Sequence, residues 1–287
     1  MSNFTDFNVL SAEEDVALQY VETPDHLTDA DIVILPGSKN TLADLSYLQE
    51  KQFASALDRH LCRQRELIGI CGGYQMIGQR IADPYGVEQG GASRGLGYLD
   101  IETELTKTKR TTHVVANPMD ALVHHHSAVR GYHIHMGVTY RGKERPCFTI
   151  RPNTTPVEEA SSLEDGLDGA IRADGLVWGT YIHGVFDEPE FRRAWLNRAR
   201  ARKGLPPLEI HASHAITSRL HSELDRWADH LSYPRSILPP PIRQPFQEFR
   251  TLVPKTDSHA RVDIHFFLGG CQYLPFSCQP STSRYTA

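Results

Sequence analysis

The chain has 287 residues, a formal net charge of −5 and a sequence pI of about 6.3. This length can bury a substantial core in one or two domains, and the acidic balance argues against an electrostatic surface for nucleic acid or membranes. With no long apolar run and no charged-then-apolar leader, we expect a soluble, cytoplasmic protein without a nucleic-acid or membrane partner.

The five cysteines are widely spaced and contain no C-x-x-C pair. This pattern fits neither a disulfide framework nor a zinc site, and it suits a reducing compartment. Consecutive side chains point in different directions, so the tract His124-His125-His126 is predicted to be a solvated loop. We therefore expect no metal site.

The first third of the chain alternates between strand and helix patterns. Residues 16–21 and 30–35 are predicted strands, residues 41–63 carry an apolar stripe at helical spacing, and a short apolar run at 67–70 predicts a further strand. Alternation of this kind predicts a parallel sheet with right-handed crossovers.

The apolar run at 67–70 ends at Cys71, and a stretch competent to form a helix follows at 74–81. A cysteine at a sharp strand-to-helix turn needs neighbours without a Cβ atom, and it lies where a helix N-terminus favours a thiolate and can hold an oxyanion. The glycines that meet this need are Gly69, Gly72 and Gly73. The pattern predicts a nucleophile elbow, and the alternative is a small buried core cysteine.

The middle of the chain predicts a loop at 83–93 and antiparallel strands at 101–105, 111–115 and 132–140. A buried strand at 177–182 then ends at His183. A histidine at the carboxyl end of a strand in the same sheet can reach the cysteine, whatever their separation in sequence.

The last part predicts helices at 190–202 and 215–231 and then changes character. We expect domain boundaries at 1–205 for the main domain and 206–232 for a closing helix region. Residues 233–287 are Pro-rich and are expected to be a disordered extension, or else to dock the apolar patch 265–268 onto a partner.

Further segments of the chain are informative as a set, namely residues 2–7 (SNFTDF), 35–41 (LPGSKNT), 69–76 (GICGGYQM), 95–97 (GLG), 131–137 (GYHIHMG) and 178–187 (WGTYIHGVFD). In sequence and in order, these segments resemble class I glutamine amidotransferases of the cobyric acid synthase type. The resemblance covers roughly residues 2 to 232 and implies an α/β, flavodoxin-like fold. Its mostly parallel sheet would be flanked by helices and carry an antiparallel extension.

The resemblance implies that Cys71 is the nucleophile and His183 its general base. It also implies an oxyanion hole formed by backbone N–H groups of Gly72 and of Gly37 or Ser38. Taken alone, the turn at 36–41 is an ordinary strand-to-helix connection in which Thr41 caps the helix.

Three further residues are expected to contact glutamine. Gln75 resembles the family residue that contacts the bound substrate, although a surface helix position is its alternative. His135 is either a substrate contact or a structural histidine, and Arg110 is predicted to bind a carboxylate. Similar segments in the family read Tyr-Glu-Ile-His, and the position of that glutamate, two residues before His135, is occupied here by His133, so no role of that carboxylate carries over.

Most class I amidotransferases have a glutamate two residues after the histidine, where this chain has Val185. The active pair is therefore a dyad unless another carboxylate orients the imidazole. Asp187 is a candidate, and its alternative role is to cap the helix that follows.

The resemblance implies glutamine as substrate and a synthetase domain or chain as partner. That synthetase, with ATP and Mg²⁺, would amidate side-chain carboxylates of adenosylcobyrinic acid a,c-diamide. No phosphate loop of the form G-x-x-x-x-G-K-S/T occurs here, so we expect no cofactor in this chain, which looks like the glutaminase half of such a synthase. Two alternatives are an amidotransferase subunit that serves a separate lipid II ligase, and a non-catalytic remnant.

Overall fold

The computed structural model describes residues 4–124, 127–152, 166–210 and 260–267. Two histidines of the tract, the expected helix at 215–231 and most of the Pro-rich extension lie outside this part of the chain. Among the helices in the described ranges, none is both long and apolar enough to cross a membrane.

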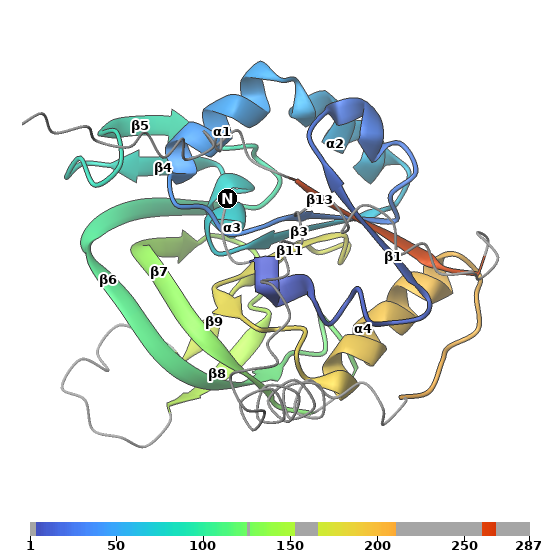
Figure 1. The fold of residues 1–287 in the computed structure, drawn as a ribbon. Helices are drawn as coiled ribbons and strands as arrows, with labels where there is room; N and C mark the ends of the chain where they lie inside the picture. Colours follow the sequence, from blue (N-terminus) through green and yellow to red (C-terminus); the bar gives the residue numbers. More distant parts are fainter. Residues whose placement is uncertain (1–3, 125–126, 153–165, 211–259, 268–287) are drawn as a thin grey trace, which may run out of the picture.

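A central sheet holds the described strands in the order β1-β13-β2-β3-β11-β10 (Figure 1). Its parallel strands are β1 (Val16–Val21), β13 (Val262–Phe267), β2 (Ile32–Leu35), β3 (Glu66–Ile70) and β11 (Val177–Thr180), and β10 (Ala170–Ile171) is antiparallel at one edge. The predicted fold class, a mostly parallel sheet flanked by helices with an antiparallel extension, is confirmed.

Strand β13 overturns one expectation. It belongs to the segment predicted to be disordered, yet it lies between β1 and β2, pairing Val262 with Val16 and Ile264 with Ile32. Phe266 and Phe267 are each 1% exposed, so these two residues of the apolar patch pack inside the chain rather than against a partner. The six-residue run shows no clear period, and its strand conformation depends on hydrogen bonds to both neighbours.

Helices cover both faces of the central sheet. Figure 1 shows α1 (Thr41–Glu50) and α2 (Phe53–Cys62) on one side and α4 (Pro189–Arg202) on the other. The single helix predicted at 41–63 is divided because Gln52 adopts a left-handed φ of 62°. Leu67 packs toward α1 and α2, whereas Ile68 and Ile70 face the core that includes α4.

A second sheet carries the antiparallel extension, in the order β12-β7-β6-β4-β5. Its strands are β12 (Ile182–His183), β7 (Val129–Arg141), β6 (Ile101–Pro118), β4 (Arg80–Asp83) and β5 (Gly91–Arg94). Off this path, β8 (Phe148–Pro152) pairs with β6, and β9 (Leu167–Asp168) pairs with β8. The two strands predicted at 101–105 and 111–115 are one long strand, interrupted by a register shift between Glu104 and Lys109. The loop predicted at 83–93 includes β5, and the helix predicted at 74–81 is only α3 (Gly72–Met76).

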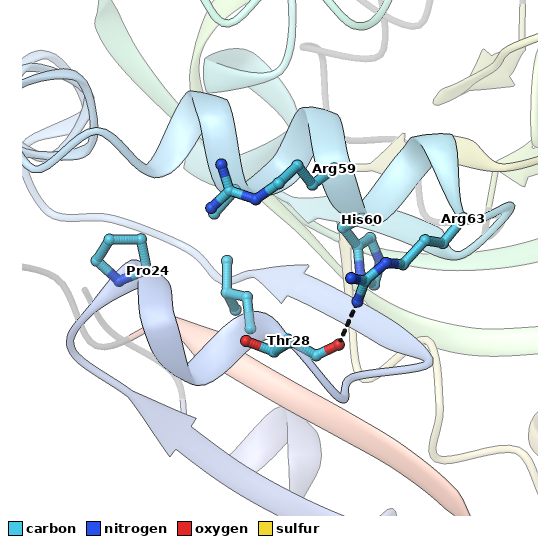
Figure 2. Close-up of a pocket in the computed structure, with 7 residues that line it drawn as sticks. Pro24, Thr28, Arg59, His60 and Arg63 are labelled. Carbon is cyan, nitrogen blue, oxygen red and sulfur yellow. Dashed lines mark hydrogen bonds between the residues drawn. The ribbon is translucent and has the colours of Figure 1, made fainter.

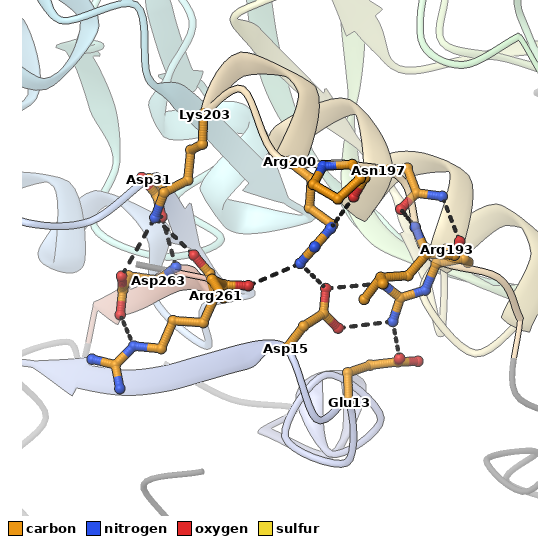
Figure 3. Close-up of polar contacts among 12 residues, drawn as sticks. Glu13, Asp15, Asp31, Arg193, Asn197, Arg200, Lys203, Arg261 and Asp263 are labelled. Carbon is orange, nitrogen blue, oxygen red and sulfur yellow. Dashed lines mark hydrogen bonds and ion pairs between the residues drawn. The ribbon is translucent and has the colours of Figure 1, made fainter. Parts of the chain in front are cut away.

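Buried ion pairs fasten the N-terminal segment to α4. Glu13 accepts a hydrogen bond from Arg192 Nε at 2.6 Å, and Asp15 accepts from Arg193 Nη2 at 2.9 Å and Arg200 Nη1 at 3.0 Å. Figure 3 shows Glu13 and Asp15 facing the helix. Each buried charge has an opposite charge beside it, so the segment before β1 is held in one position.

Candidate active site

Cys71 lies at the turn between β3 and α3. Its backbone angles are φ 52° and ψ −110°, which a residue with a side chain rarely adopts. Strain of this kind persists only where the surrounding structure enforces it, and it concentrates at functional sites. The predicted strained elbow is confirmed.

The glycines around Cys71 are required by close backbone contacts. A Cβ atom on Gly73 would lie 1.9 Å from the carbonyl oxygen of Leu35, and one on Gly69 would lie 2.6 Å from the backbone of Gly73. A Cβ on Gly72 would lie 2.9 Å from the backbone nitrogen of Ser38. The elbow therefore packs directly against the end of β2 and the loop that follows it.

A cavity of about 390 Å³ opens beside the thiol, within the usual volume range for small-molecule sites. It brings together most of the predicted site residues, namely Cys71, His183, Gly37, Ser38, Gly72, Gln75 and His135, and its other lining residues are Lys39, Thr41, Glu88, Ile134 and Met136. The structure describes the backbone of Arg110 but not its side chain. The backbone of Arg110, on β6, pairs with that of His135, on β7.

His183 ends β12, and its imidazole is bound on one side by a carboxylate that the sequence had not suggested. Nδ1 lies 2.6 Å from Oδ2 of Asp6, and both side chains are largely buried. Burial alone would lower the pKa of His183, but the hydrogen bonds with Asp6 and with the Cys71 thiol outweigh it and raise the pKa to about 10.

The sequence analysis considered two positions close to His183 in the chain, Val185 and Asp187. Val185 is buried in the core. Asp187 does not cap α4, whose N-cap position is Glu188, followed by a proline suited to the first turn. Burial and the nearby charge of Asp6 raise the pKa of Asp187 to about 6.

Gln75 is buried rather than on the surface, so the alternative of a surface helix position is wrong. Its Nε2 donates to the carbonyl oxygen of Met136 at 3.2 Å and to the hydroxyl of Tyr181 at 3.1 Å. The thiol of Cys71 donates to the carbonyl oxygen of Ile134 at 3.1 Å. These bonds join the elbow to β7, which forms the opposite wall of the cavity.

His135 stacks on Tyr181, with ring centroids 4.1 Å apart, and also lines the cavity. Its neighbour His133 points to a different partner, donating from Nε2 to Asp168 at 3.0 Å. Burial would raise the pKa of Asp168, but hydrogen bonds from His133, Thr180 and the backbone of Tyr181 lower it. Sequence reasoning missed both Tyr181 and Asp168. Tyr181 lies within the segment 178–187, but nothing in that segment indicates its contacts with Gln75 and His135, and Asp168 lies in none of the segments that carry the resemblance.

The loop after β2 is ordered by its own polar side chains. Ser38 donates from Oγ to Asp44 at 2.5 Å, and Asn40 caps α1 by accepting from the backbone nitrogen of Ala43 at 2.9 Å. The expectation that Thr41 caps this helix is therefore wrong, and Thr41 instead donates to Gln75 Oε1 at 3.4 Å. Ordering of this loop fixes Gly37 and Ser38 across from Gly72.

A second, much smaller hollow lies between α2 and η2 (Pro24–Leu27), as Figure 2 shows. Its volume of about 30 Å³ is room for about one water molecule. Arg63 there donates to the carbonyl oxygen of Thr28 at 3.0 Å. Burial and the nearby charge of Arg65 lower the pKa of His60 to about 3. The His60 imidazole is therefore neutral, and it contributes no positive charge that could bind an anion in this hollow.

A cysteine at a strained elbow that shares a small-molecule cavity with an imidazole is typical of cysteine-dependent enzymes that attack carbonyl groups. Comparison with known families narrows this class. The family model for CobB/CobQ-like glutamine amidotransferase domains matches residues 1–191. The chain belongs to the CobB/CobQ-like glutamine amidotransferase family, and it is an amidotransferase of the Cys-His type.

Curated relatives agree with this assignment. The cobyric acid synthase of Klebsiella pneumoniae is 47% identical over 221 residues, which cover 75% of this chain and 42% of that protein. The cobyric acid synthase of Salmonella dublin is 44% identical over 245 residues, which cover 79% of this chain and 46% of that protein. The chain thus spans less than half the length of these two relatives.

Among solved structures, PurLQS from Thermotoga maritima is similar with a TM-score of 0.49 and 15% identity, covering 68% of this chain and 92% of that one. The family assignment rests on the sequence matches.

Proposed function

We propose that this chain hydrolyses glutamine through Cys71 and His183 and releases ammonia for amidation of a corrinoid carboxylate. The observation that supports the proposal most strongly is the placement of both side chains in one cavity, with the His183 imidazole held by Asp6. Family membership adds glutamine as the substrate.

The chemistry follows from this geometry. The proton of the Cys71 thiol passes to His183, whose raised pKa favours the imidazolium, and the sulfur of Cys71 attacks the side-chain amide carbon of glutamine to give a tetrahedral oxyanion. His183 then returns the proton to the departing nitrogen, so that the C–N bond breaks and ammonia leaves. Water next hydrolyses the γ-glutamyl thioester to glutamate and restores the thiol.

Backbone N–H groups of Gly72 and of Gly37 or Ser38 are the proposed donors to the oxyanion, because these residues line the cavity on the side of the elbow. Gln75 and His135 are proposed contacts to the bound glutamine. We assign the α-carboxylate to Arg110, which is supported by its pairing with the cavity residue His135.

Glutamate release from glutamine by the purified chain, under reducing conditions, tests the proposal. Activity is expected in the wild type and absent in Cys71→Ala and His183→Ala. Cys62→Ala is the matched control, because Cys62 is an exposed free cysteine at the end of α2 that does not line the cavity, and its replacement is expected to leave the rate unchanged. A folded wild type without glutamate release would contradict the proposal.

The acceptor side of the proposal comes from the relatives, which are cobyric acid synthases. ATP and Mg²⁺ would act in a synthetase partner, and a free catalytic thiol suits the reducing cytoplasm. The test adds this chain to a cobyric acid synthase whose own amidotransferase cysteine is replaced by alanine, with ATP, Mg²⁺, glutamine and adenosylcobyrinic acid a,c-diamide.

The number of amide groups formed on the corrinoid is measured by mass spectrometry. Glutamine-dependent amidation that requires Cys71 of the added chain supports the assignment. Amidation with ammonium salt but none with the added, active chain would contradict it.

A further inference from the structure

We propose that Asp6 is the positioning residue for His183, and that the N-terminal segment thereby completes a Cys-His-Asp arrangement with Cys71. The inference rests on the proposed glutaminase function. It assigns a role to a residue 177 positions away from the histidine in sequence, in a segment with no catalytic pattern of its own.

The contact has the geometry that a positioning carboxylate needs. Asp6 Oδ2 lies 2.6 Å from Nδ1 of His183, and the two side chains are 13% and 6% exposed. A carboxylate only accepts, so Nδ1 carries the proton of this bond. Nε2 is therefore the nitrogen left to exchange a proton with the Cys71 thiol, and the ring is held in that orientation.

The titratable groups near the imidazole are few. They are Asp6 from η1 (Phe4–Phe7), Cys71 from the elbow and Asp187 from the turn before α4. Three other titratable side chains line the same cavity, namely Lys39, Glu88 and His135. Asp187 is the other carboxylate on this side, and it is close enough to Asp6 for their charges to repel. The contact to Nδ1 belongs to Asp6, so Asp187 serves as the matched control.

The position of Asp6 is fixed by packing and by ion pairs. The adjacent Phe7 is 1% exposed, and its ring centroid lies 4.1 Å from that of Phe266 on β13. The carbonyl oxygen of Phe7 accepts from the backbone nitrogen of Leu10 at 3.0 Å. Farther along, Glu13 is held by the arginines of α4 (Figure 3). A carboxylate held in place by the segment that follows it can fix an imidazole, whereas one on a free terminus would not.

The test compares wild type, Asp6→Asn and Asp187→Asn by two readouts. The first is an NMR titration of the His183 side chain, which does not depend on turnover. Wild type is expected to titrate at about pH 10. Asp6→Asn is expected to titrate markedly lower, because burial still disfavours the imidazolium while the carboxylate is gone, and Asp187→Asn is expected to stay near wild type.

The second readout is glutamine hydrolysis. In Asp6→Asn we expect kcat to fall by about 10²- to 10⁴-fold, the scale known for a carboxylate that sets a catalytic imidazole's tautomer, with little change in KM. Asp187→Asn is expected to keep the wild-type kcat. Circular dichroism establishes that each variant is folded, and Asp6→Ser provides a smaller replacement if the asparagine variant does not fold.

A folded Asp6 variant with the wild-type His183 titration and kcat would overturn the inference. A fall in kcat together with an unchanged titration would also overturn it, because the effect would then not pass through the imidazole. If wild type released no glutamate, the proposed function would fail, and the titration would still decide whether Asp6 controls His183.

Discussion

Replacing Phe266 by alanine tests whether β13 completes the central sheet. The side chain is 1% exposed, and its ring lies 4.1 Å from Phe7 and 5.8 Å from Tyr20 by centroids. Loss of a fully buried phenylalanine costs about 3–5 kcal/mol, a large part of the roughly 5–15 kcal/mol that keeps a domain folded. A disordered extension would lose nothing by the same change.

Urea unfolding followed by circular dichroism measures the difference. Tyr140→Ala is the control, because Tyr140 is 63% exposed and its truncation is expected to change the unfolding free energy by no more than about 0.5 kcal/mol. Phe266 supports Phe7, which neighbours Asp6, so the folded Phe266→Ala variant is also expected to have a lower kcat. Equal unfolding midpoints for Phe266→Ala and Tyr140→Ala would refute the placement of β13.

Two further predictions concern the elbow and the acidic side chain near His183. Gly73→Ala is expected to abolish glutamate release and lower the unfolding temperature, because its Cβ would lie 1.9 Å from the carbonyl oxygen of Leu35. Gly204→Ala is the control and is expected to keep activity, because there is open space around Gly204 and the only strain comes from its φ of 70°. An active Gly73→Ala variant would contradict the close packing at the elbow. Asp187 has a folded pKa raised from 3.8 to about 6, so its ionised form destabilises the fold as pH rises through that window. In urea unfolding, Asp187→Asn is expected to raise the free energy of unfolding by on the order of 1 kcal/mol at pH 7, after allowance for solvent screening, and this gain should shrink as the pH falls toward 4. A gain in unfolding free energy that does not depend on pH would argue against ionisation of Asp187 as its cause.

Local sequence patterns predicted the elbow correctly, because its requirements lie within a few residues. The apolar run before Cys71 and the glycines around it indicated both a strand and a turn that no side chain could enter. The same reasoning gave the wrong length for the helix that follows, since α3 ends at Met76 where the chain turns into the second sheet. Helix length was set by packing between the two sheets, which no local pattern encodes.

In the candidate active site, too, local patterns indicated some features and tertiary packing decided others. Cys71 directly follows β3, and β3 pairs in parallel with β11, which ends at Thr180. The chain then passes into β12 of the second sheet, which ends at His183, so the residue expected in the same sheet as Cys71 reaches the cavity from the neighbouring sheet. The sequence left the partner of His183 open, with Asp187 as a candidate, because the search for a carboxylate stayed near the histidine in sequence. Asp6 reaches it from the other end of the domain, through a segment whose position depends on Phe266 and on ion pairs with α4.

The sequence by itself determined the class of sheet, the strained turn and the two residues proposed to carry the chemistry, because hydrophobic period, glycine spacing and strand ends are local properties. Only the tertiary structure decided which carboxylate holds the imidazole and which strand lies between β1 and β2. Both depend on contacts between segments more than 170 residues apart, and such contacts form from the total free energy of packing rather than from any local preference.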